Sequence, residues 1–156
     1  MNSNSTQLNA LQSAQGQRMV QLGVVLFLLG LLTGLVVPMM ANPRMGLSSH
    51  LSGITNGIAL IAIGSFWQRL VLSVSVLKIA YLLALYGTFA NWLGTFLAGA
   101  MGAGGRFMPI NTGLHKASAL QEGLVDGIIL TLSLSIIAFC VIAIWGLRPG
   151  AARSAV

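Results

Sequence analysis

Acidic residues are almost missing from this chain of 156 residues, which contains only Glu122 and Asp126. Charged residues of both signs make up 6% of the sequence. A soluble globular domain carries roughly 25%. Two carboxylates and eight basic side chains are too few to cover the surface of a fold that is solvated by water. The shortage excludes an ordinary soluble domain and indicates that lipid solvates most of the surface.

Cysteine and clustered basic residues are scarce as well. Cys140 is the single cysteine and lies inside an apolar run, which excludes a disulfide framework and a metal-thiolate cluster. The eight Lys and Arg residues occur singly between Arg18 and Arg153, without the basic stripe of a nucleic-acid-binding surface. The formal charge of +6 is therefore interpreted as a membrane topology signal, and no nucleic-acid partner is expected.

Apolar residues are what the chain has in abundance, at 56% of the sequence. They form four long runs, each long enough to cross a hydrocarbon layer of ~30 Å as an α-helix. The predicted fold is therefore all-α: an integral membrane protein with one four-transmembrane-helix bundle over residues 19–147. The predicted spans are residues 19–40, 47–67, 74–98 and 118–145.

The two ends of the chain read as tails. Residues 1–18 are rich in Ser, Asn and Gln and have no apolar core, so they are predicted to be a flexible polar tail rather than a cleaved signal peptide. Residues 148–156 are predicted to be a short C-terminal tail.

Basic residues set the expected orientation, since four spans leave both termini on one side. Five basic residues flank the spans on the terminal side, and three lie on the other side. This bias favours termini in the cytoplasm of a bacterial inner membrane. The first group is Arg18, Arg69, Lys78, Arg148 and Arg153, and the second is Arg44, Arg106 and Lys116.

The second span opens with a polar, glycine-rich segment that contains His50, Gly53 and Gly57. At 100° per residue these three share one stripe, which lets either a neighbouring helix or a flat cofactor approach the backbone closely. His50 suits an axial haem ligand, or else an interfacial histidine that is hydrogen-bonded to a loop. Asn56 lies ~120° around the helix from His50, so the two serve one cofactor only if they come from different subunits.

Polar residues of the third and fourth spans complete the candidate site. Asn91 lies deep enough to need a hydrogen-bond partner, either structural or substrate. Ser118 and Gln121 predict a capping box, so Glu122 either complements the helix dipole or has a functional role. Asp126 lies ~12 Å into the helix, where a carboxylate is expensive, and is a functional candidate by default.

These polar residues are expected to gather at one level of the bilayer. The first and third spans end, and the second and fourth begin, at the same membrane face. Scattered structural polar groups have no reason to share a leaflet, so a site in the outer half of the bundle or at a subunit boundary is predicted. Its members are His50, Asn56, Asn91, Glu122 and Asp126.

Residues 45–64, with the sequence MGLSSHLSGITNGIALIAIG, resemble the hydroxylaminobenzene mutase family. These small bacterial membrane proteins turn hydroxylaminobenzene into 2-aminophenol. The pattern of four spans matches too. The same segment is more distantly similar to styrene oxide isomerase, which also has a His followed six residues later by Asn and Gly. Phe89-Ala90-Asn91 matches an aromatic-Ala-Asn element there, but Thr95 stands near the position of its substrate-contacting tyrosine.

The resemblance implies a cofactor and an assembly. By analogy with the isomerase, a ferric haem b would lie between the subunits of a homotrimer, with His50 as the iron ligand and Asn56 orienting the substrate. The iron would act as a Lewis acid on a small aromatic hydroxylamine, and Asp126 or Glu122 would relay protons. Gly53 and Gly57 would border the cofactor.

Two other classes of function fit parts of the sequence. In a haem-bearing electron-transfer anchor, His50 and His115 would ligate one iron from both sides, although His115 is expected in a loop. A small transporter or scaffold subunit would also account for a polar, glycine-rich second span. The absorption spectrum of the purified protein distinguishes the three classes.

Overall fold

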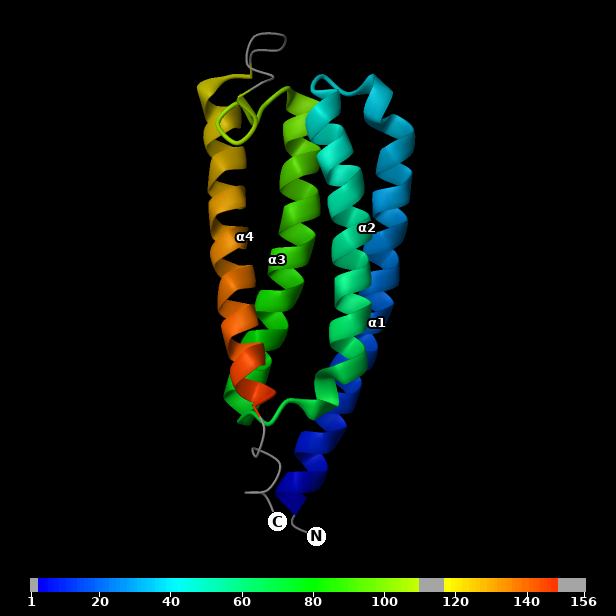
Figure 1. Ribbon diagram of the computed structural model, residues 1–156, viewed down its shortest axis with the longest axis vertical. Coiled ribbons are helices and arrows are strands. Elements are labelled where there is room, and N and C mark those ends of the chain that lie inside the picture. The colour runs from blue at the N-terminus through cyan, green and yellow to red at the C-terminus, as the bar shows by residue number, and fades with distance from the viewer. Residues whose placement is uncertain (1–2, 110–116, 149–156) are drawn as a thin grey trace.

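The computed structural model describes residues 3–109 and 117–148, which fold into four long helices. These are α1 (Ser3–Val36), α2 (Pro43–Phe66), α3 (Val74–Met101) and α4 (Ala119–Gly146). They run up and down in chain order, with two short 3₁₀ turns, η1 (Val37–Met39) and η2 (Trp67–Arg69), after α1 and α2 (Figure 1). No strand occurs in the described ranges. All four helices are long and apolar enough to cross a membrane, which confirms the predicted all-α fold.

Local sequence signals explain several helix ends at the upper end of the bundle, where α1 and α3 finish and α2 and α4 begin (Figure 1). Pro38 lies in η1 and so follows the end of α1. Asn42 caps α2 by accepting a hydrogen bond from the backbone N–H of Met45. Ser118 and Gln121 form the predicted capping box of α4, with both reciprocal hydrogen bonds present.

The start of α1 differs from the prediction. The helix begins at Ser3, so residues 3–18, expected to belong to a flexible tail, are helical. Two buried glutamines explain the difference: Gln12 Nε2 donates to the carbonyl of Leu70 at 2.9 Å, and Gln15 Oε1 accepts from the indole of Trp67 at 3.1 Å. The polar start of α1 is therefore held in place by hydrogen bonds to Trp67 of η2 and to Leu70, which follows η2.

Glycines bring α1 and α2 into backbone contact along most of their length. A Cβ added to Gly30 would lie 2.6 Å from the backbone nitrogen of Ile54, and one on Gly57 would lie 2.6 Å from that of Phe27. A Cβ on Gly64 would lie 2.6 Å from the carbonyl oxygen of Gly16. Lipid tails are as apolar as the helices, so close packing of small residues is what holds such a pair together. We call this α1–α2 contact the glycine seam.

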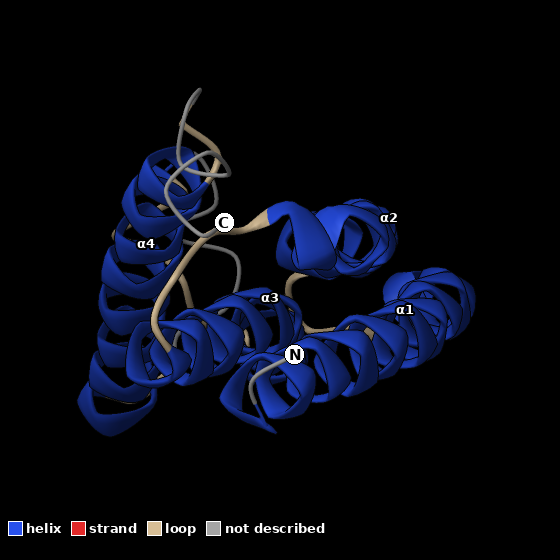
Figure 2. Ribbon diagram, turned by 90° about the horizontal axis from the view of Figure 1, so that it is seen from below, coloured by secondary structure: helices blue, strands red, loops and turns tan. Residues whose placement is uncertain are grey.

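The fourth helix is held differently. Of the long helices, α4 packs along α3, away from α1 and α2 (Figure 2). Gly87 and Gly94 of α3 receive Ile136 and Ile128 of α4. The opposite face of α4 is uncovered, and its exposed apolar residues include Leu120, Leu124, Leu130, Leu134, Ile137, Val141, Ile144 and Trp145. A lipid solvent, or another protein surface, must cover that face.

The apolar core lies mainly toward the lower end of the bundle. Trp67 is completely buried there, and its ring stacks on Phe139 at a centroid distance of 6.5 Å. Tyr81 packs edge-on against the same indole. Most of the candidate polar residues lie on the upper parts of the helices, away from this aromatic cluster.

Candidate functional site

His50 lies in the upper part of α2 and faces α1. Its Nδ1 is 2.8 Å from the carbonyl oxygen of Gly30. Because a carbonyl oxygen only accepts, this contact assigns the hydrogen to Nδ1 and leaves the lone pair of a neutral ring on Nε2. Gly34 makes room for the ring, since a Cβ there would lie 2.6 Å from Nδ1. No group in the described ranges is hydrogen-bonded to Nε2.

Gly53 and Gly57 are predicted to border a cofactor, but the space beside both glycines is filled by atoms of α1. Both are buried in the glycine seam. A Cβ on Gly53 would lie 2.5 Å from Cα of Gly30 and 2.9 Å from the indole of Trp92. Within one subunit, helix packing therefore accounts for the small residues, and no flat group fits between α1 and α2 at this point.

Asn56 faces α3 rather than α1. Its Nδ2 donates to the backbone carbonyl of Thr88 at 3.3 Å. Two turns toward the helix start, the fully buried Ser49 donates to the carbonyl of Trp92 at 3.0 Å. The structure therefore does not bring Asn56 and His50 together within one subunit, as their angular separation predicted.

Asn91 lies between Gly87 and Gly94 on the face of α3 that receives α4. Its backbone carbonyl accepts from Thr95 Oγ1 at 2.7 Å. Its side-chain amide forms no hydrogen bond with any other residue of the described ranges. Asn91 thus retains unused donors and an acceptor at a depth where polar groups need partners.

Glu122 clamps the glycine-rich segment that follows α3. Its Oε2 accepts from the backbone N–H of Gly104 at 3.0 Å, and Oε1 accepts from that of Gly105 at 3.4 Å. Gly104 has φ of 95°, a conformation that L side chains rarely adopt, so its backbone can present this donor to the carboxylate. The carboxylate therefore fixes the path of the chain that leads to Arg106.

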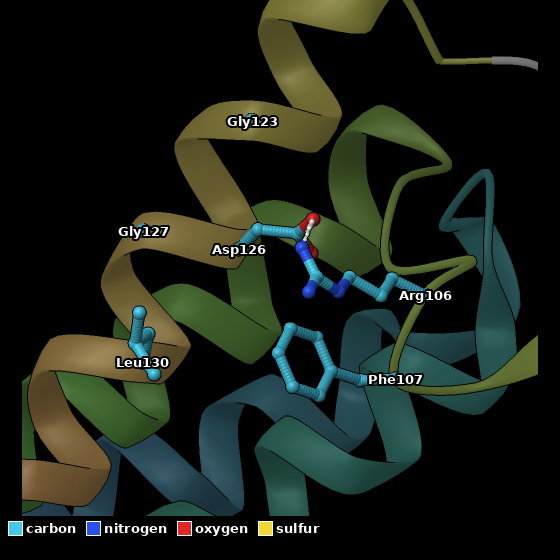
Figure 3. Close-up of a pocket in the computed structure, with 6 residues that line it drawn as sticks. All are labelled: Arg106, Phe107, Gly123, Asp126, Gly127 and Leu130. Atoms are coloured by element: carbon cyan, nitrogen blue, oxygen red, sulfur yellow. Dashed lines mark ion pairs between the residues drawn. The ribbon is translucent and has the colours of Figure 1, made fainter.

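Asp126 lies one turn further along α4 and meets that chain. Its Oδ2 is 3.5 Å from a guanidinium nitrogen of Arg106. Its Oδ1 is buried and has no hydrogen-bond partner. The two side chains meet beside the ring of Phe107 (Figure 3). They line a pocket of about 350 Å³ together with Gly123, Gly127 and Leu130.

The predicted site residues occupy separate positions. Glu122 and Asp126 lie toward the upper end of the bundle, whereas Asn56 lies near the middle of α2. Glu122 and Asp126 act on the same segment, residues 102–109. His50 faces α1, and Asn56 is bonded to α3. His115, the second ligand of the electron-transfer alternative, lies outside the described residues. No cluster of three or more metal-ligating side chains occurs in the described ranges.

Several polar residues of this end were not singled out from the sequence. From the sequence, Arg106 is only a topology signal, and Phe107 is only part of the segment that follows the third span. Thr33 accepts from the indole of Trp92 at 3.0 Å and joins α1 to α3. Asn42 donates its amide to the carbonyl of Ala103 at 3.1 Å. The sequence signal for Asn42 is its place directly before Pro43, because Asn is a favoured cap of a helix that starts with proline.

Four apolar helices that carry an imidazole, two amides and two carboxylates define a small polytopic membrane protein with a polar site. The segment around His50 resembles hydroxylaminobenzene mutases and styrene oxide isomerase, and comparison with known proteins confirms this resemblance. Residues 15–148 match the family model described as styrene oxide isomerase, and the chain belongs to this family.

Two relatives carry the name hydroxylaminobenzene mutase, both from Ectopseudomonas oleovorans. The chain is 56% identical to HabB over 137 residues, which are 88% of this chain and 84% of HabB. It is 44% identical to HabA over 125 residues, which are 80% of this chain and 93% of HabA. No solved structure matches the chain.

Proposed function

We propose that this protein is a membrane-bound hydroxylaminobenzene mutase, which rearranges hydroxylaminobenzene to 2-aminophenol. The observation that carries the proposal is the 56% identity to HabB over nearly the whole of both chains. The reaction is an isomerisation. The N–O bond breaks, a C–O bond forms at the ortho carbon, and the hydrogen of that carbon is replaced by one on nitrogen. No electrons enter or leave.

The chain supplies groups for the proton movements. Asp126 is the proposed proton relay because one of its carboxylate oxygens is buried and free of hydrogen bonds. Asn91 offers an unpaired amide for orienting a hydroxyl or amino group. Asn56 is a weaker candidate, since its amide is already bonded to the carbonyl of Thr88. Glu122 supports the segment beside Asp126 instead of meeting a substrate.

A ferric haem b is part of the proposal through the family. His50 fits this group in one respect: Nδ1 is hydrogen-bonded to a backbone carbonyl, the arrangement that orients metal-bound imidazoles, and Nε2 is left for iron. When bound, the haem would supply a Lewis acid. The buried glycine seam provides no cradle for it, so the porphyrin would lie outside the α1–α2 contact, against another subunit.

The site and the assembly are proposed together. His50, Asn56 and Asp126 face different neighbours within one chain. A homotrimer would bring residues of adjacent chains to one centre and would cover the free face of α4. The expected location is the bacterial inner membrane, with the termini in the cytoplasm.

An assay of the purified protein with hydroxylaminobenzene tests the proposal. Chromatography of the products should show 2-aminophenol as the main isomer, without an added reductant and without oxygen uptake. Formation of 4-aminophenol at the rate of the uncatalysed reaction, or no conversion by a haem-loaded oligomer, would refute it. An absorption spectrum of the same sample separates the alternatives, because a bis-histidine electron carrier is low-spin.

A further inference from the structure

The lower end of the bundle, where α2 and α4 finish and α3 begins, contains a hollow that none of the candidate site residues lines (Figure 1). Its volume is about 350 Å³. Volumes of ~300–1,000 Å³ are typical of small-molecule sites. The lining residues are Gln7, Leu8 and Leu11 of α1 and Val74, the first residue of α3. We call this hollow the lower groove, and it lies at the end of the bundle opposite to the starts of α2 and α4.

One wall of the lower groove is an ordered part of α1. Gln12, one turn after Leu8, donates through Nε2 to the carbonyl oxygen of Leu70 at 2.9 Å. Leu8 and Leu11 are partly buried and pack against the apolar core. The groove is therefore preformed, and a ligand that enters it does not have to order the chain first.

Lys78 brings a positive charge to the lower groove. It is exposed and lies one turn after Val74, so the two residues share a face of α3. Side chains of a helix lean toward its N-terminus, so the long side chain of Lys78 extends toward Val74 and the groove. Arg69 is exposed too, and it directly precedes Leu70, whose carbonyl is bonded to the α1 wall.

No acidic side chain offsets these charges. The two carboxylates of the chain, Glu122 and Asp126, both lie near the start of α4, at the other end of the bundle. Asp126 is paired with Arg106, and Glu122 accepts from backbone N–H groups. The lower end therefore attracts anions, and the apolar walls of Leu8 and Leu11 strengthen the attraction because they exclude water.

The place of the lower groove along α3 identifies the anion as the headgroup of a lipid. Lys78 lies in the first turns of α3, and one turn further into the span the same face carries Leu82, which is 64% exposed. An acyl chain can lie against Leu82 while its phosphate lies beside Lys78. A soluble anion would meet the charge but not the apolar face, so this amphipathic surface favours a phospholipid.

We propose that the lower groove binds one anionic phospholipid per subunit, from the leaflet that faces the chain termini. Lys78 and Arg69 attract the phosphate, and the side-chain amide of Gln7 is hydrogen-bonded to the rest of the headgroup. The acyl chains lie along α3 beyond Lys78. Because the groove is formed by both α1 and α3, the bound lipid joins the starts of these helices and stabilises this end of the bundle. The proposal does not depend on the mutase reaction.

Native mass spectrometry of the full-length protein in detergent measures the binding. Dioleoyl-phosphatidylglycerol and dioleoyl-phosphatidylcholine are titrated separately, and the dissociation constants of the first lipid per subunit are compared. A basic residue near an anionic headgroup contributes on the order of 5-fold in affinity. With two such residues, the wild type should bind the phosphatidylglycerol about 10-fold more tightly than the phosphatidylcholine, or better.

The variants change charge at exposed positions, so the fold is expected to be kept. Lys78→Gln should lower the preference for phosphatidylglycerol about 5-fold, and Gln7→Glu should lower it by a similar factor because its carboxylate repels the phosphate. Lys78→Arg keeps the charge and should keep the preference. Arg44→Gln is the matched control, since it removes the same charge at the exposed start of α2. Size-exclusion profiles confirm that each variant is intact.

Loss of the preference in Lys78→Gln and Gln7→Glu, with wild-type values in Lys78→Arg and Arg44→Gln, supports the lower groove as the site. This result stands even if the protein is inactive as a mutase. Equal affinity of the wild type for the two lipids overturns the proposal. So does an unchanged preference in Lys78→Gln, or an equal loss in Arg44→Gln, which would show that only the net charge of the protein matters.

A cross-linking measurement tests the other occupant of the groove, a second copy of the chain. Gln7→Cys is made in a Cys140→Ser background, labelled with a benzophenone maleimide and illuminated in vesicles of the same phosphatidylglycerol. A protein mass increased by one phosphatidylglycerol supports the lipid. Cross-linked subunits, or the absence of a lipid adduct, would mean that another subunit or no lipid fills the groove, and the proposal is then rejected.

Discussion

At the scale of single residues, the role of a polar side chain in an apolar helix depends on its hydrogen-bond partner. His50 is hydrogen-bonded to the carbonyl of Gly30, and Ser49 donates a hydrogen bond to the carbonyl of Trp92. Both partners belong to neighbouring helices, and these bonds use only part of the polar groups present. Among the candidate residues within the described ranges, the groups without a hydrogen bond include Nε2 of His50, the amide of Asn91 and one oxygen of Asp126. These are the atoms available for chemistry.

The first prediction concerns His50. The purified wild type should contain about one haem b per subunit, and His50→Ala should lose the Soret absorbance together with activity. The reason is that Nε2 is the imidazole nitrogen left free by the Gly30 contact. Gly34→Ala is a matched test, because its Cβ would push the ring and should lower haem content without removing the ligand. Full turnover in a haem-free His50→Ala sample contradicts the cofactor.

The second prediction concerns Asp126. Asp126→Asn should lower kcat by about 100-fold, the usual scale of a lost general acid or base, while the haem content stays at the wild-type level. Single-turnover kinetics and the absorption spectrum of the same sample measure the two quantities. Cys140→Leu is the control, since Cys140 is exposed on the same helix and far from Asp126 along it. A normal kcat in Asp126→Asn would remove the relay from the mechanism.

The candidate residues could be selected from the sequence because charge and amide groups are costly within apolar spans, as Asp126 and Asn91 illustrate. That rule gives depth along a helix, and from it the residues are predicted to gather at one level of the bilayer. It does not give the partner. Glu122 was a possible relay by this rule, yet its carboxylate is used by Gly104 and Gly105. Arg106 and Phe107 could not be selected, since residues after a span carry no depth signal.

At the scale of helices, α1 and α2 form a pair locked by backbone contact, and α4 is attached at the side of α3. Hydropathy predicted all four spans because lipid imposes the length of each apolar run. Capping residues fixed the start of α4, as Ser118 and Gln121 indicated. The start of α1 could not be predicted, because Gln12 and Gln15 are ordered by Leu70 and Trp67, far away in the sequence.

The third prediction compares glycines of two helices. Gly57→Ala should destabilise the protein by about 1–3 kcal/mol, because its Cβ would be forced against the backbone of Phe27. Gly123→Ala should be neutral or slightly stabilising, since its Cβ meets nothing and alanine favours the helix. Thermal unfolding in detergent measures both. Equal melting temperatures would contradict the glycine seam.

At the scale of the whole molecule, the candidate polar groups of one subunit do not gather around one point. The groups on α2 and those on α4 face away from one another, and no helix covers the outer face of α4. Assembly is the simplest way to unite them. The fourth prediction is that the active species is a homo-oligomer, expected to be a trimer. Native mass spectrometry in detergent measures its mass, and an active monomer would contradict it.

The fifth prediction concerns the fate of the oxygen atom. The reaction is expected to be an intramolecular transfer, so the product hydroxyl should keep the oxygen of the substrate. Anaerobic turnover in ¹⁸O-labelled water, followed by mass spectrometry of 2-aminophenol, measures this. An apolar pocket limits attack by bulk water, which is the physical reason for the expectation. Label in the product would show that water attacks the ring.

The two kinds of glycine in this chain have a consequence for how the protein tolerates sequence change. In a saturation library selected for activity, Gly30 and Gly57 should reject every replacement, alanine included, because their neighbours are backbone atoms that cannot move aside. Gly123 and Gly127 should accept alanine, because a Cβ at either position would meet no atom within 4 Å.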